Sequence, residues 1–68
     1  MGVRLYEAIL SRPESIARIR AAQRDIERLG GRVSFAPPAP GGLILVTLAL
    51  PETLTPAQVL PGIPFAPA

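Results

Sequence analysis

Leu43-Ile44-Leu45-Val46-Thr47-Leu48-Ala49-Leu50 is the one long apolar stretch of this chain, and the fold follows from asking what covers it. Gly41-Gly42 precedes the stretch and Pro51 follows it, so residues that interrupt regular structure mark both ends. Eight residues are far fewer than the ~20 that a membrane-spanning helix needs. A short apolar run bounded in this way predicts a buried β-strand over residues 43–50.

Alternate side chains of a strand point to opposite faces of the sheet, and here both sets are apolar. We expect one set to lie beneath a helix: Ile44, Val46, Leu48 and Leu50. The other set points outward: Leu43, Leu45, Thr47 and Ala49. A sheet face in water normally carries polar residues, so the outward set predicts a surface that binds a partner. The alternative is a mildly apolar face that stays exposed, as much protein surface does.

The main helix is predicted to begin at Ser11-Arg12-Pro13-Glu14 and to end near Leu29. Ser11 and Glu14 have the spacing of a capping box, and Pro13 fits the first turn. Gly30-Gly31 offers the left-handed position that ends many helices. Residues at helical spacing predict its buried side: Ile16, Ile19, Ala22, Ile26 and Leu29.

Arginines recur every four residues on the opposite side of this helix, at positions 20, 24 and 28. They could contact phosphates, which makes a nucleic-acid binder one alternative. Asp25 and Glu27 lie among them, so we favour a solvated face. An RNA binder that uses a sheet would also carry stacking aromatics on its central strands, where this chain has only Tyr6. Glu14 and Arg18 are spaced for an i,i+4 ion pair.

Three further strands and a second helix are predicted. Residues 3–10 alternate imperfectly and fit a first strand, although a helix is an alternative there. Residues 32–36 predict a short second strand with Val33 and Phe35 inward. Thr55-Pro56-Ala57-Gln58 has the pattern of a helix start, and Pro61-Gly62 limits that helix to about a turn and a half. Residues 63–66 predict a fourth strand, which Pro64 confines to an edge.

The predicted order of elements is strand, helix, strand, strand, short helix, strand. This is the ferredoxin-like βαββαβ plan of an α+β protein, a four-stranded antiparallel sheet with two helices on one face. The chain of 68 residues corresponds to a single small domain, residues 1–68.

The composition excludes several kinds of chemistry. The chain has no Cys and no His, which removes the usual nucleophiles, bases and soft metal ligands. We therefore expect no enzyme activity, no cofactor and no metal site. The N-terminal residues have no signal-peptide pattern, so the expected location is the cytoplasm. All seven basic residues are Arg, which indicates a GC-rich and heat-adapted source.

Three segments and the closing stretch carry a resemblance to a known family. They are Leu5–Leu10, Leu29-Gly30-Gly31-Arg32-Val33, Thr47-Leu48-Ala49-Leu50-Pro51 and Leu60-Pro61-Gly62-Ile63-Pro64-Phe65. In this order and spacing the chain resembles the prodomain-type inhibitors of subtilisin-like serine proteases from Leu5 to Ala66, with a shorter tail. The resemblance implies a ferredoxin-like fold whose open sheet face docks on the protease, while the C-terminal tail enters the active-site cleft.

The sequence therefore predicts a non-enzymatic module that binds a protein through its open sheet face. The predicted contact residues are Leu43, Leu45, Thr47, Phe65, Pro67 and Ala68. The partner implied by the resemblance is a serine protease. The alternative is a homo-oligomeric scaffold protein that self-associates through the same face, because a core this small rarely supplies more than ~3–5 kcal/mol of stability.

Overall fold

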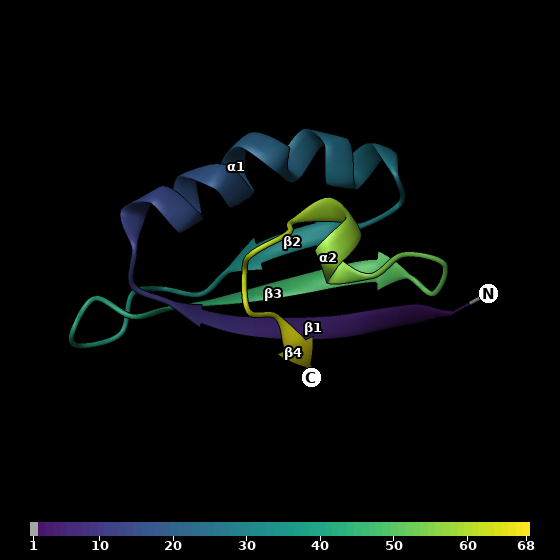
Figure 1. The fold of residues 1–68 in the computed structure, drawn as a ribbon. Helices are drawn as coiled ribbons and strands as arrows, with labels where there is room; N and C mark the ends of the chain where they lie inside the picture. Colours follow the sequence, from purple (N-terminus) through teal and green to yellow (C-terminus); the bar gives the residue numbers. More distant parts are fainter. Residues whose placement is uncertain (1) are drawn as a thin grey trace.

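The computed structural model describes residues 2–68, which form six elements. They are β1 (Val3–Leu10), α1 (Pro13–Arg28), β2 (Arg32–Phe35), β3 (Ile44–Pro51), α2 (Pro56–Val59) and β4 (Ala66–Pro67). The strands make one antiparallel sheet in the order β2-β3-β1-β4, and both helices lie over the same face of it (Figure 1). The predicted α+β, ferredoxin-like βαββαβ arrangement is confirmed.

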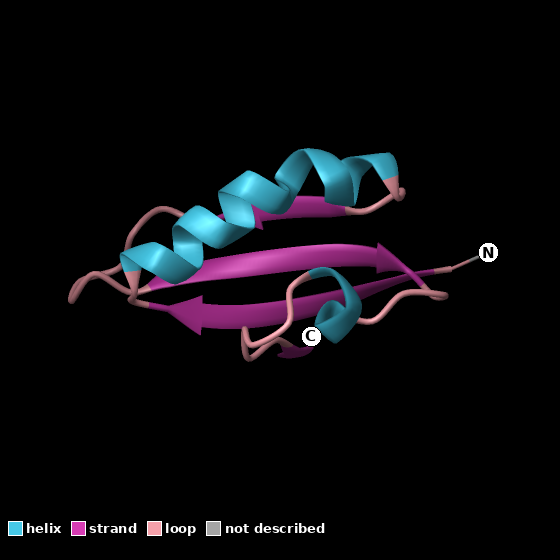
Figure 2. Ribbon diagram, turned by 45° about the horizontal axis from the view of Figure 1, so that its top comes forward, coloured by secondary structure: helices cyan, strands magenta, loops and turns pink. Residues whose placement is uncertain are grey.

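The long apolar stretch is at the centre of the sheet, as β3. It pairs with β1 over its whole length, from Val3 opposite Pro51 to Leu10 opposite Ile44. The outer strands are much shorter: β2 pairs with β3 over four residues, and β4 meets β1 only at Tyr6 and Glu7. Figure 2 shows these two long central strands running under α1. The predicted strand at 43–50 is thus observed one residue later, at 44–51.

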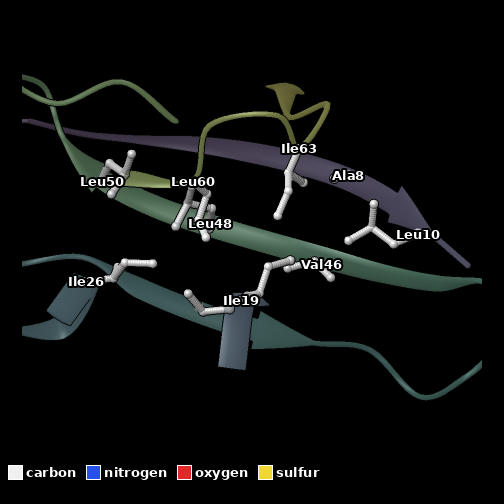
Figure 3. Close-up of a cluster of buried hydrophobic side chains, with 10 residues drawn as sticks. Ala8, Leu10, Ile19, Ile26, Val46, Leu48, Leu50, Leu60 and Ile63 are labelled. Carbon is white, nitrogen blue, oxygen red and sulfur yellow. The ribbon is translucent and has the colours of Figure 1, made fainter. Parts of the chain in front are cut away.

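The core lies between this sheet and the helices (Figure 3). Its side chains come from every element except α2 and β4 and from the segment after α2: Ala8, Leu10, Ile19, Ile26, Val33, Val46, Leu48, Leu50, Leu60 and Ile63. The inward set predicted for β3 is confirmed, with Val46, Leu48 and Leu50 completely buried and Ile44 packed against them. Full burial of one such side chain contributes about 1.5–3 kcal/mol.

The predicted N-cap of α1 is wrong. Arg12, not Ser11, is the N-cap residue, and it makes no side-chain capping hydrogen bond. The reason is Pro13, because a proline ring clashes with the preceding residue when that residue is helical. Arg12 is accordingly extended, with φ −87° and ψ 123°, and the helix begins at Pro13.

The end of α1 is as predicted, but its last apolar residue is not buried. Gly30 has φ +90°, the left-handed conformation expected after a helix. Ile19 and Ile26 are buried, and Ile16 and Ala22 pack at the margin of the core. Leu29 is exposed, because it is the C-cap residue and lies beyond the last turn that faces the sheet.

The arginines of α1 make different contacts from those predicted. Arg18 donates to the carbonyl oxygen of Pro61 at 2.7 Å, which ties α1 to the segment after α2. It does not form the predicted ion pair with Glu14; in the described chain the ion pair observed is Arg28 with Asp25, at 3.4 Å and exposed. The guanidinium of Arg20 lies 4.4 Å from the ring centroid of Phe35, a cation–π contact.

The C-terminal third departs from the prediction in its boundaries. Helix α2 is a single turn whose start is as predicted, with the Thr55 N–H donating to Gln58 Oε1 at 2.7 Å. The fourth strand is at 66–67 instead of 63–66. Around Pro64 the chain makes a tight turn, in which the Phe65 N–H donates to the Ile63 carbonyl at 2.8 Å, so no extended strand forms there. The predicted edge position is confirmed.

Candidate functional site

The candidate site is the sheet face that the helices leave uncovered, which we call the outer face (Figure 1). Its side chains follow from the strand register, because directly paired residues point to the same side. Successive rows across β1, β3 and β2 are Leu5–Ala49–Arg32 and Glu7–Thr47–Ser34, followed by the pair Ile9–Leu45. Val3 lies opposite Pro51 at one end, and Ala66 of β4 lies opposite Glu7.

Large apolar side chains dominate the part of the outer face made by β1 and β3. Val3, Leu5, Ile9 and Leu45 expose between 36% and 66% of their surface. Isolated exposed apolar residues are ordinary in soluble proteins. On the outer face they form two groups, Val3 with Leu5 and Ile9 with Leu45, with the Glu7–Thr47 row between them. Exposed apolar side chains gathered on one face commonly mark an interaction surface.

The predicted contact residues of β3 lie where the sequence placed them. Leu45 and Thr47 point to the outer face, with Leu45 opposite Ile9 and Thr47 opposite Glu7. Leu43 is exposed and directly precedes β3, where its carbonyl accepts a hydrogen bond from the Ala39 N–H at 2.8 Å. Leu43, Leu45 and Thr47 therefore follow one another along β3 and the residue that precedes it.

The predicted contact residues of the C-terminus do not all join that line. Phe65 packs against the core on the helix side, which gives it a structural role. Pro67 pairs with Tyr6 on the edge of the sheet, and the Ala68 N–H donates to the Leu5 carbonyl at 3.0 Å. Pro67 and Ala68 are thus exposed residues held along β1.

Val3, Leu5 and Ile9 are site residues that the sequence analysis did not select. Their common face on β1 was visible as alternation, with Glu7 among them. The pattern alone left open which face of β1 turns toward the helices, because Tyr6, Ala8 and Leu10 on the other face are also apolar. The pairing of β1 with β3 decides it, since it aligns Ile9 with Leu45 and Ala8 with the buried Val46.

Two charged side chains belong to the outer face in the described strands, Glu7 on β1 and Arg32 on β2. Neither is in an ion pair. Glu7 borders a shallow hollow of about 340 Å³ between β1 and the segment 64–67. Apart from Glu7 the hollow is walled by apolar residues: Ala8, Ile9, Leu45, Pro64, Ala66 and Pro67. This arrangement suits a side chain with an apolar stem and a positive end.

Residues 2–68 contain no group of three or more acidic, His or Cys side chains placed to hold a metal ion. Neither of the two described helices has the length and hydropathy needed to cross a bilayer. The outer face therefore offers a partner exposed apolar side chains and two charged ones, Glu7 and Arg32.

Comparisons with protein-family models, with curated proteins and with solved structures gave no match for this chain. The resemblance to prodomain-type protease inhibitors therefore stays a prediction from the sequence. The fold defines the class of protein, a ferredoxin-like α+β domain with one sheet face left open.

Proposed function

We propose that this protein is a non-enzymatic interaction module that binds a protein partner through the outer face of its sheet. The observation that carries the proposal is the exposed apolar surface of Val3, Leu5, Ile9 and Leu45 on one side of the sheet. Covering it would remove this apolar surface from water, which is favourable by about 25 cal/mol per Å². The sheet is a rigid platform for such docking, because its inner side is packed on the core.

The resemblance to prodomain-type inhibitors adds a class of partner, a subtilisin-like serine protease. Docking by the sheet face suits the described chain better than insertion of its tail. Residues 66–68 are hydrogen-bonded along β1, so they would have to leave the sheet edge before they could enter a cleft. The proposed contact surface is accordingly the outer face, with Leu45 and its partner Ile9 toward one end of it.

The test is inhibition of a subtilisin-like protease by an excess of this protein. We expect turnover to fall in the presence of the wild-type chain and to be restored with Leu45→Lys, which places a charge in the docking area. Ala21→Lys is the matched control, since it adds the same charge to an exposed position of α1. Undiminished turnover at micromolar wild-type protein would contradict an inhibitor-type role.

Self-association is a second candidate function, and one observation favours it. The outer face carries one carboxylate and one guanidinium, Glu7 and Arg32, without an ion pair for either. A face that presents both members of a charge pair is complementary to a second copy of itself.

A further inference from the structure

We propose that the occupant of the outer face is a second copy of this chain, stacked sheet to sheet about a two-fold axis, with Glu7 of each copy paired to Arg32 of the other. This inference rests on the proposed interaction role of the outer face and develops its second candidate, self-association. It is carried by the positions of the two charges, by the small residues between them and by the hollow beside Glu7.

The two charges lie on opposite sides of β3. Arg32 is opposite Ala49, and Glu7 is opposite Thr47. They are therefore two strand spacings apart across the sheet and two residues apart along it, or roughly 12 Å in total. The two charges form no ion pair within one copy. Both charges remain available to a partner.

The midpoint between the two charges falls on β3 between Ala49 and Thr47. A two-fold axis between the stacked sheets exchanges the two positions if it passes over this point and runs perpendicular to the line that joins the two charges. Each copy then brings its Arg32 to the Glu7 of the other. Ala49 and Thr47 have small side chains, which lets the two sheets approach where the axis passes. Ser34, next to Thr47 on β2, is small as well.

The hollow beside Glu7 has the properties that an arginine side chain requires. Its volume is about 340 Å³, and Ile9 and Leu45 supply apolar wall beside the single carboxylate. The aliphatic stem of Arg32 from the second copy would cover these two residues while its guanidinium meets Glu7. The contact would cover the most exposed apolar side chain of the outer face, Ile9.

The dimensions of the molecule suit a dimer of this kind. The chain exposes 4615 Å² of surface, whereas a monomeric protein of 7.2 kDa usually exposes ~4100 Å². The chain thus exposes about 500 Å² more than a monomer of its mass usually does.

Sedimentation equilibrium of the whole chain, from micromolar to millimolar concentration, tests the inference. We expect the wild type to reach twice 7.2 kDa. Glu7→Arg and Arg32→Glu should each weaken the dimer by about tenfold or more, because each places like charges together twice per dimer. The double variant Glu7→Arg/Arg32→Glu restores opposite charges and should return the dissociation constant to within about threefold of wild type. Glu27→Arg, on the exposed side of α1, is the control and should leave it unchanged.

Leu45→Lys provides a second probe that does not depend on the charge pair, and circular dichroism checks that each variant is folded. A wild-type protein that stays monomeric at millimolar concentration overturns the inference. So does a dimer that the single charge reversals leave intact. If the monomeric wild type still inhibits the protease and Leu45→Lys abolishes the inhibition, the proposed function stands and only the second copy is wrong. A monomer without inhibition contradicts both.

Discussion

The two faces of β3 carry almost equally apolar residues and have opposite surroundings. On the inner face Val46, Leu48 and Leu50 are completely buried under the helices. On the outer face Leu45 keeps more than a third of its surface exposed, and Thr47 and Ala49 are only partly covered. The difference does not come from hydrophobicity. It arises because both helices lie over the same face of the sheet and leave the other face uncovered (Figure 1).

The comparison teaches where stability and binding reside in this molecule. Inner residues contribute to the stability of the fold through close packing within the single chain. Outer residues gain the same kind of burial only when a second molecule arrives. Paired substitutions on the two faces separate these contributions.

Leu48→Ala should have the largest effect, a loss of about 3 kcal/mol in the free energy of unfolding, because it leaves a cavity in the completely buried core. That loss approaches the whole ~3–5 kcal/mol that a core of this size supplies. Leu45→Ala, three residues away on the outer face, should cost about 1 kcal/mol or less. Urea unfolding at equal protein concentration measures both. Equal losses at the two positions would contradict the division between the faces.

Gly31→Ala tests how closely the helix layer packs on the inner face. A Cβ atom at Gly31 would lie 2.8 Å from both the Ala49 carbonyl oxygen and Ile26 Cγ2. Overpacking of this kind usually costs about 1–3 kcal/mol. Thermal unfolding followed by circular dichroism measures the loss, and stability equal to wild type would show that α1 moves freely away from the sheet.

Gly41→Ala is the comparison for that variant, because no atom lies within 4 Å of the added Cβ there. Its cost should come only from the backbone, which has φ +89° at Gly41. A left-handed conformation costs a residue with a side chain about 1–2 kcal/mol. The two glycines therefore distinguish a steric requirement of the core from a conformational requirement of the loop.

Arg20→Gln should have the smallest effect, a loss of about 0.5 kcal/mol, because it removes the cation–π contact with Phe35 at the margin of the inner layer. Arg24→Gln is the control on the same helix, and it should leave the free energy of unfolding nearly unchanged. Urea unfolding of the two variants side by side checks the difference. A larger loss for Arg24→Gln would contradict a stabilising contribution of the Arg20–Phe35 contact.

Much of the candidate site was predictable from β3, and less from the ends of the chain. Leu43, Leu45 and Thr47 followed from alternation within one strand, which a sequence displays directly. Phe65 was assigned to the contact surface as part of a strand, but the turn at Pro64 directs it to the core. The β1 residues Leu5 and Ile9 needed the pairing of two distant segments to be placed.

The order of elements, the buried side of β3 and the end of α1 follow from local sequence patterns, because hydrophobic periodicity and glycine act over short distances along the chain. Its local rules failed where two of them competed, as at Ser11, whose capping pattern is overridden by Pro13. Only the tertiary structure decided which face of β1 is open and that Glu7 and Arg32 share it. The register between strands sets both, and register depends on residues that are far apart in sequence.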